Sequence, residues 1–261
     1  MAATSPGSGW TTTMTKGSDC NDNLFSADNS VCSVQTPTTP PATPPDLCDK
    51  LKKLNEDNKY KEKLAFVIAK AKTDSTKEYG YSIEKGASDY VAATNDSKGN
   101  LDFPDISKTV GVIHDHTSPR TTIGPDNFPE ITEYIQMFSR EDLRTFVKLL
   151  NFTDTNGIAI ADVFSTLSDN TGNVYTLKYE GTYNDIKGKS IDVDALQKAY
   201  DTNFSDPDVY GGIESAFASF LELDVKIPGI VVYKTTPGAA PIKLGFTSDG
   251  VRILPSNTPC K

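Results

Sequence analysis

The apolar run VGVI at residues 110–113 constrains the fold most strongly, because it passes directly into the polar segment His114-Asp115-His116. A short continuous apolar run is typical of a strand buried on both faces, since a half-exposed strand alternates apolar and polar residues. The run therefore predicts the central strand of a covered sheet. Both histidines of the chain lie at its end, which makes this strand end a candidate functional site.

Patterns on both sides of this strand predict helices and further strands. Residues 47–75 carry apolar side chains at helical spacing behind the N-cap residue Asp46, and a break near 55–58 divides them into two helices. Residues 78–83 (EYGYSI) alternate and predict a strand in a hairpin with 89–94. A helix is expected from Ser139, followed by a strand hairpin, two helices and three short strands at 157–181, 194–204, 210–223, 229–234, 242–246 and 251–255.

These elements indicate an α+β fold, with a mixed β-sheet flanked by helices. Residues 1–46 are rich in Ser, Thr and Pro and end in TPTTPPATPP, which predicts a flexible arm. We expect a helical lead-in at 47–75, a core that carries the site at 76–155, and a C-terminal α+β extension, partly β-rich, at 156–261 that packs on this core.

Charge and hydropathy exclude some partners. The net charge of −9 disfavours nucleic acid, because the average field repels phosphate backbones. No run approaches the roughly 18 apolar residues that span a bilayer, so membrane insertion is not expected. The first residues show neither a basic nor an apolar signal region, so no export signal is expected in the chain as given.

The four cysteines, Cys20, Cys32, Cys48 and Cys260, have no C-x-x-C spacing, which argues against a thiolate metal site. Their positions near the two ends of the chain favour disulfide staples, and with them an extracytoplasmic or cell-surface location, over free thiols. The pairing stays open.

The histidine pair is suited to metal binding. Side chains alternate along a strand, so His114 and His116 are expected on one face and Asp115 on the other. Neutral imidazoles are good zinc ligands, and a catalytic zinc needs a third protein ligand and an open position. The alternative is an ordinary polar strand end.

The segment FSREDL places Ser139 and Asp142 three residues apart before an apolar periodic run. This is the capping-box pattern, in which Ser139 is the N-cap and Asp142 returns to its backbone N–H. The same two side chains could instead face a pocket shared with the histidines.

Together, Glu78, the His114-x-His116 pair and Ser139-x-x-Asp142 resemble, in this order, the motif of the JAB/JAMM (MPN) metallopeptidase family, over about residues 76–150. The resemblance implies a cytidine-deaminase-like α+β core in which His114, His116 and Asp142 bind zinc. It implies that Glu78 is the general base, that Ser139 hydrogen-bonds the oxyanion, and that the reaction is hydrolysis of a peptide or isopeptide bond in a peptide or protein substrate.

The sequence departs from that motif in its spacing, because 22 residues, Thr117 to Phe138, separate the histidines from Ser139. An inserted loop can supply this length, since loop-closure entropy grows slowly, but Asp126 becomes a rival third ligand. Glu84 is a rival base, because even spacing puts it on the strand face of Glu78.

Two functions follow as hypotheses. The first is a zinc metallopeptidase with isopeptidase-like chemistry. The second is a catalytically inactive JAB/JAMM-like binding or structural module. In either case the Pro-rich arm and the terminal cysteines suggest a module of a larger secreted or surface polypeptide, or of a secretion-associated assembly.

Overall fold

A computed structural model describes residues 46–96, 101–117, 120–123, 129–132, 136–236, 239–248 and 253–260. All of them belong to the second of two units, Pro45–Lys261. Residues 1–45 of the expected arm, with Cys20 and Cys32, lie outside the described residues.

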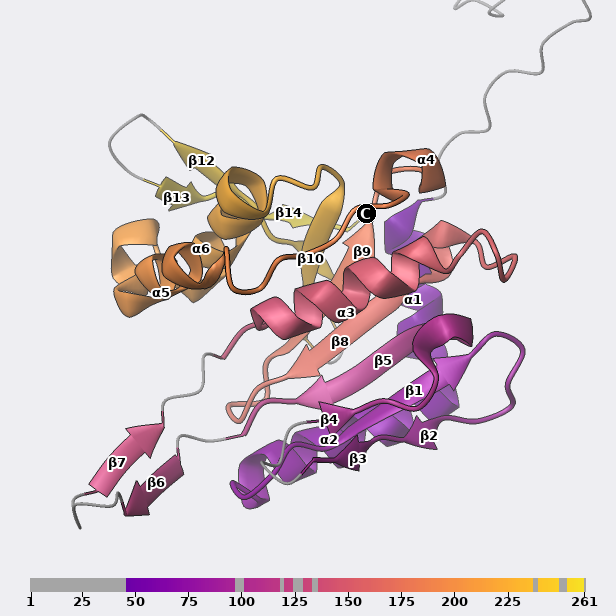
Figure 1. The fold of residues 1–261 in the computed structure, drawn as a ribbon, viewed down its shortest axis with the longest axis horizontal. Helices are drawn as coiled ribbons and strands as arrows, with labels where there is room; N and C mark the ends of the chain where they lie inside the picture. The colour runs from indigo at the N-terminus through magenta and orange to yellow at the C-terminus, as the bar shows by residue number, and fades with distance from the viewer. Residues whose placement is uncertain are drawn as a thin grey trace, which may run out of the picture. The chain divides into compact units, whose positions relative to one another are not determined.

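The unit is built on a mixed eight-stranded sheet, which confirms the expected α+β class (Figure 1). The strand order is β14-β11-β10-β9-β8-β5-β1-β2. Among the described strands, β5 and β8 are the one parallel pair, and the other neighbours in the sheet are antiparallel. The bounds are β1 (Gly80–Glu84), β2 (Val91–Ala92), β5 (Thr109–Asp115), β8 (Phe164–Ser168), β9 (Val174–Tyr179), β10 (Ile230–Thr235), β11 (Ile242–Lys243) and β14 (Thr258–Pro259).

The run at 110–113 forms an interior strand, as expected. β5 is completely buried except at Val110, and it lies between β1 and β8. The crossover that a parallel β5–β8 pair requires contains α3 (Arg140–Asn151). The sheet therefore continues without interruption from the expected core into residues beyond 156.

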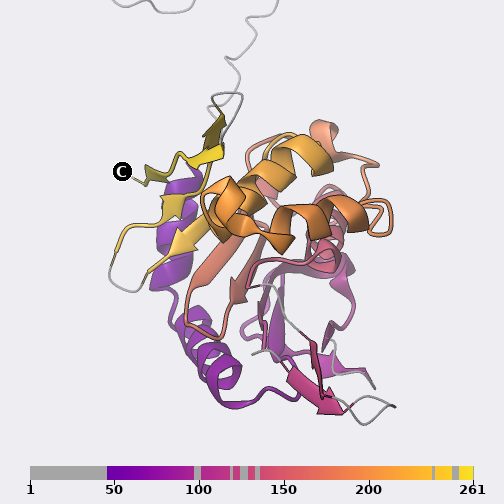
Figure 2. The ribbon, with the colours of Figure 1, turned by 90° about the vertical axis from the view of Figure 1, so that its left-hand side faces the viewer.

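Helices cover both faces of the sheet. α1 (Leu47–Glu56) and α2 (Asn58–Thr73) are separated at Asp57, which ends the first helix and caps the second through its side chain. The expected break is thus confirmed. α3, α5 (Gln197–Ser205) and α6 (Ile213–Phe220) belong to the other side, as Figure 2 shows with α1 and α2 in purple and α5 and α6 in orange.

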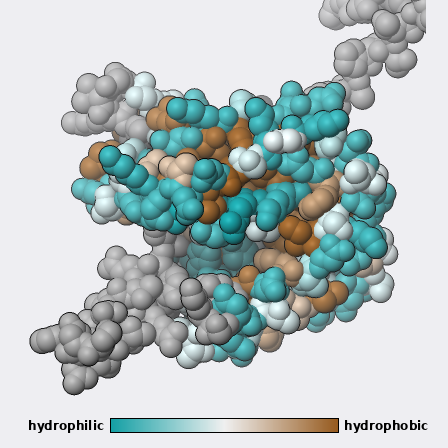
Figure 3. Space-filling view, viewed as in Figure 1, coloured by the Kyte–Doolittle hydropathy of each residue, from teal (hydrophilic) through white to brown (hydrophobic). Residues whose placement is uncertain are grey.

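Neighbouring residues of β5 show which core each face belongs to. Val112 packs in the main core with Leu143 and Phe146 of α3. Ile113 packs with Tyr60 and Val67 of α2. Because side chains alternate along a strand, His114 shares the α3 face with Val112. On the side that Figure 3 shows, most of the surface is hydrophilic, as expected where helices turn their polar faces outward.

Smaller elements differ from the expectation in two places. The connection at 117–137, expected as a loop, contains the antiparallel strands β6 (Arg120–Ile123) and β7 (Pro129–Thr132). The expected strand at 242–246 is divided between β11 and β12 (Phe246–Ser248), which pairs with β13 (Ile253–Pro255) outside the main sheet. The remaining elements are β3 (Thr94–Asn95), β4 (Leu101–Asp102), η1 (Ile106–Lys108), η2 (Ile160–Asp162), α4 (Tyr183–Ile186), η3 (Pro207–Tyr210) and η4 (Leu221–Val225).

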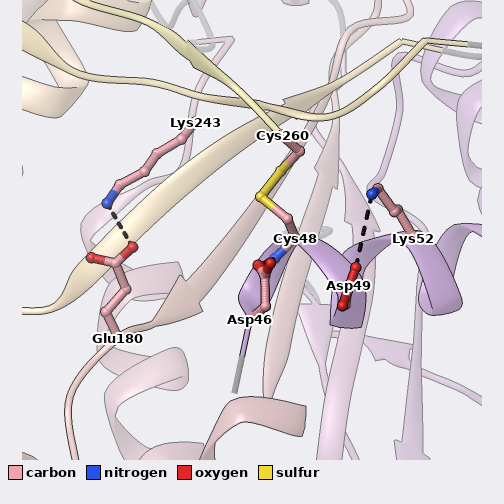
Figure 4. The surroundings of a disulfide bond; sticks show 7 residues. All are labelled: Asp46, Cys48, Asp49, Lys52, Glu180, Lys243 and Cys260. Atoms are coloured by element: carbon pink, nitrogen blue, oxygen red, sulfur yellow. Dashed lines mark hydrogen bonds and ion pairs between the residues drawn. A yellow bond between two sulfur atoms is a disulfide. The ribbon is translucent and has the colours of Figure 1, made fainter. Parts of the chain in front are cut away.

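A disulfide joins Cys48 in α1 to Cys260, 212 residues later (Figure 4). Cys260 is buried beside Leu47, Leu51 and Tyr233 in a small cluster under α1. The bond therefore fastens the two ends of the folded unit to each other. No helix in the described part of the chain is long and apolar enough to cross a membrane.

Candidate metal centre

The end of β5 holds both histidines in fixed positions. His114 lies opposite Gly80 of β1 and Leu167 of β8 in the strand register. The backbone N–H of His116 donates to the carbonyl of Ser168 at 3.0 Å, which extends the pairing with β8 beyond the last residue of the strand. The two residues are 2% and 7% exposed.

Gly80 makes room for the first imidazole. A Cβ at Gly80 would lie 3.3 Å from Cβ of His114 and 3.0 Å from the carbonyl oxygen of Ile113. It would also lie 2.9 Å from a methyl group of Leu101. A larger residue would therefore displace the strand that carries His114.

The first turn of α3 supplies the carboxylate. The backbone N–H and the hydroxyl of Ser139 donate to Oδ2 of Asp142 at 2.7 and 2.8 Å, and the N–H of Asp142 donates back to Oγ of Ser139 at 3.1 Å. The expected capping box is confirmed. The hydroxyl proton of Ser139 is directed at Asp142 in this arrangement.

The same carboxylate faces both histidines. Oδ1 of Asp142 lies 3.1 Å from Nε2 of His114, and Oδ2 lies 3.2 Å from Nε2 of His116. The cap and the shared pocket, which the sequence presents as alternatives, are therefore both present. Oδ2 of Asp142 accepts the hydrogen bonds of the helix cap, and both carboxylate oxygens face the histidines.

Burial raises the pKa of Asp142, but the two histidines outweigh this effect and hold its pKa well below the usual range. Asp142 is thus an ionised acceptor. Nδ1 of His114 is buried and makes no hydrogen bond, an arrangement that costs free energy unless a partner is supplied. The donor set fits a metal ion, because it combines an ionised carboxylate with two buried imidazoles.

The three ligand atoms lie within 4.8 Å of one another. In a tetrahedral site with bonds of about 2.0–2.1 Å, neighbouring ligand atoms lie about 3.3 Å apart. The contacts of 3.1 and 3.2 Å between Asp142 and the histidines are close to that separation. The three side chains are thus close enough to share one metal ion.

Comparison of the chain with protein-family models, curated proteins and solved structures finds no match. The geometry itself shows a buried His114-His116-Asp142 group that can bind a metal ion. This group is compatible with a JAMM-type motif.

Glu78 lies two residues before the start of β1 and is partly buried. Burial raises its pKa, the charges of His116 and His114 lower it, and the charge of Asp142 raises it further, with a net rise. The Glu78 carboxyl therefore interacts electrostatically with all three candidate ligands.

The structure does not bring Glu84 to the histidines. Glu84 is exposed and pairs with Thr109, five residues before His114, which corresponds to about 17 Å along a strand. The register also shifts between Ile83 and Glu84, where Val110 of β5 is the extra residue. Asp126, the rival third ligand, lies outside the described residues.

Asp115 has a role that the sequence did not indicate. Its backbone N–H donates to the carbonyl of Tyr79 at 3.0 Å, and its Oδ1 accepts from the N–H of Tyr79 at 2.5 Å. Burial raises the pKa of Asp115 to about 7. These two bonds fix the residue after Glu78 against the strand end that carries the histidines. From the sequence, Asp115 was expected only to lie on the strand face opposite the two histidines.

Proposed function

We propose that this chain is a zinc-dependent hydrolase of the JAB/JAMM type, which cleaves a peptide or isopeptide bond. The observation that carries the proposal is the meeting of His114, at the end of β5, and His116, just after it, with Asp142 from α3 in one buried group. Two imidazoles and one carboxylate are a ligand set of catalytic zinc sites, in which the fourth position takes water or substrate.

Zinc bound there would lower the pKa of a water molecule toward 7 and polarise the scissile carbonyl. Glu78 would accept a proton from the attacking water and return it to the leaving amine. Its raised pKa suits this role, because an acid–base group works best when its pKa approaches the working pH. Tyr79 and Asp115 would hold Glu78 in place through their two hydrogen bonds.

Ser139 has two possible contributions that experiment can separate. The motif assigns it to the oxyanion of the tetrahedral intermediate. Its hydrogen bonds to Asp142 support a different task, which is to orient the carboxylate that would ligate zinc.

We also propose an extracytoplasmic or cell-surface location. The Cys48–Cys260 disulfide supports it, because disulfides persist in oxidising compartments. A larger parent polypeptide remains part of this proposal on the basis of the Pro-rich segment.

The deciding experiment is elemental analysis of protein purified without an affinity tag. Wild type is expected to hold about one zinc per chain, and Asp142→Ala is expected to lose it. Glu141→Ala is the matched control, because Glu141 is an exposed acid in the same helical turn. Asp126→Asn tests the rival ligand.

If Asp142→Ala retains zinc and Asp126→Asn loses it, the third ligand is Asp126 and not Asp142. Wild type that stays without zinc in zinc-supplemented buffer would contradict the proposal. The inactive binding or structural module would then become the better hypothesis.

A further inference from the structure

A second pocket lies where the two N-terminal helices meet. Because α1 and α2 are separated at Asp57, the layer that covers this face of the sheet is interrupted. The interruption leaves a cavity of about 630 Å³ between the helix junction, the turn after β1 and the sheet. Its apolar walls include Leu54, Ile83, Tyr90, Val110 and Phe164.

This pocket is on the opposite side of the sheet from the candidate metal centre. Phe164 and Tyr90 belong to the cluster that contains Tyr60 of α2, whereas the histidines share their strand face with Val112 and α3. A ligand in the pocket would therefore not touch the His-His-Asp group.

The pocket is basic although the chain is acidic. Five lysines and three carboxylates line it, namely Lys50, Lys53, Lys59, Lys85, Lys178, Asp57, Glu84 and Asp162, in a chain of net charge −9. Two of the carboxylates are already engaged: Asp57 accepts from the N–H of Tyr60 at 2.7 Å, and Asp162 pairs with Lys50 at 2.5 Å. The lysines of the pocket therefore outnumber its carboxylates, and two of them, Lys53 and Lys59, are exposed at its rim.

Lys178 of β9 brings an amine to this face of the sheet. It is 2% exposed, and its Nζ donates to the carbonyl of Ala161 at 2.7 Å. An ammonium group has three donors, and this is its one hydrogen bond within the described residues. The pKa of Lys178 is lowered to about 7, mainly by burial. The charge of Asp162 raises this pKa, and the charge of Lys50 lowers it. A buried amine without a carboxylate partner is costly, and an anion would supply that partner.

We propose that this pocket is a ligand site for a small organic carboxylate with an apolar chain or ring, whose charged group meets Lys178 and whose apolar part lies against Phe164 and Ile83. The size and the apolar walls match those of small-molecule sites, and the surplus of lysines favours an anionic ligand. The inference is independent of the proposed hydrolase activity.

Hexanoate is the probe, and hexanamide is its uncharged counterpart. Titration followed by ligand-observed NMR is expected to give a dissociation constant for hexanoate on the order of 1 mM. Lys178→Met is expected to weaken hexanoate binding about tenfold or more, because a hydrogen bond to a charged group is lost. Hexanamide is expected to bind wild type at least as weakly as hexanoate binds this variant.

Two further variants keep the test decisive if Lys178→Met does not fold. Lys53→Glu combined with Lys59→Glu changes only exposed rim residues and is expected to weaken binding about threefold or more. Lys198→Glu, an exposed site on α5, is the matched control and is expected to bind as wild type does.

A carboxylate also ligates metals, so each titration is repeated with EDTA. Unchanged affinity is expected, since the pocket and the metal centre lie on opposite faces. Loss of binding on chelation, equal binding of hexanamide, no binding to wild type, or unchanged affinity in both the Lys178 and the rim variants would each overturn the proposal.

Discussion

At the scale of single residues, Glu78 is the group whose function can be isolated most cleanly. Glu78→Gln keeps the size of the side chain but cannot accept a proton, so the variant is expected to retain zinc and to lose about 10²–10⁴-fold in peptide hydrolysis. Hydrolysis is measured with a peptide library on zinc-loaded protein. Glu84→Gln, at the other end of β1, is the control and is expected to match wild type. Full activity in Glu78→Gln would remove it from the mechanism.

Lys178 predicts a pH dependence of stability. Its pKa is about 7 in the folded protein, below the ordinary value of 10.5, so between these values the unfolded chain binds more protons. Stability therefore rises with pH across this window, by at most about 1.4 kcal/mol per pH unit from this residue, and the destabilisation is complete below pH 7. Urea unfolding of wild type and Lys178→Met at pH 7 and 9 measures it. An equal difference between the two proteins at both pH values would contradict the assignment.

The candidate ligands were predictable because their signals are local. Rarity and alternation single out His114 and His116, and the S-x-x-D pattern places Asp142 in a helix start. The choice between Glu78 and its rival Glu84 depends on the strand register, which no local pattern contains. The antiparallel register places Gly80 opposite His114 and Glu84 opposite Thr109, at the far end of the pair.

At the scale of elements, the first turn of α3 couples folding to the site. Ser139→Ala removes the side-chain half of the capping box, so about 1 kcal/mol of stability is expected to be lost. It also removes a hydrogen bond to Asp142, so zinc affinity is expected to fall about 10–100-fold. Chelator competition and urea unfolding measure the two effects.

Thr182→Ala is the matched control, because Thr182 and Asp185 form the same motif at α4. It is expected to lose stability without a change in zinc affinity. If Ser139→Ala instead keeps zinc affinity and loses hydrolysis, the oxyanion role is favoured over orientation of the carboxylate.

Helices and hairpins followed from short patterns, whereas strand neighbours did not. The break at Asp57, the hairpin of β8 and β9, and the start of α3 were all expected. The parallel pairing of β5 with β8 joins segments about fifty residues apart, and alternation reveals the face of a strand but not its neighbour. The sequence does not reveal the β6–β7 hairpin, because prolines within and beside it are typical of loops.

At the scale of the whole molecule, the sheet separates the candidate metal centre from the pocket beside α1 and α2, and the disulfide joins the two ends of the folded unit. Cys48 and Cys260 were candidates for a staple, but four cysteines allow three full pairings, so the sequence could not choose among them. The structure brings these two together because α1 and the last residues of the chain meet beside β10 and β11.

Removal of this disulfide is expected to lower the stability of the fold strongly without changing the candidate metal centre. The bond spans 212 residues, and a loop of that length restricts the unfolded chain strongly, so the double variant Cys48→Ser, Cys260→Ser is expected to lose about 3–5 kcal/mol. Zinc content is expected to stay unchanged, because the candidate ligands lie at the end of β5 and in α3 rather than near either cysteine. Guanidinium unfolding and elemental analysis provide the two readouts. The variant Cys20→Ser, Cys32→Ser is the control and is expected to remain sensitive to reductant. Loss of zinc with the disulfide would show instead that closure of the chain ends supports the geometry of the metal centre.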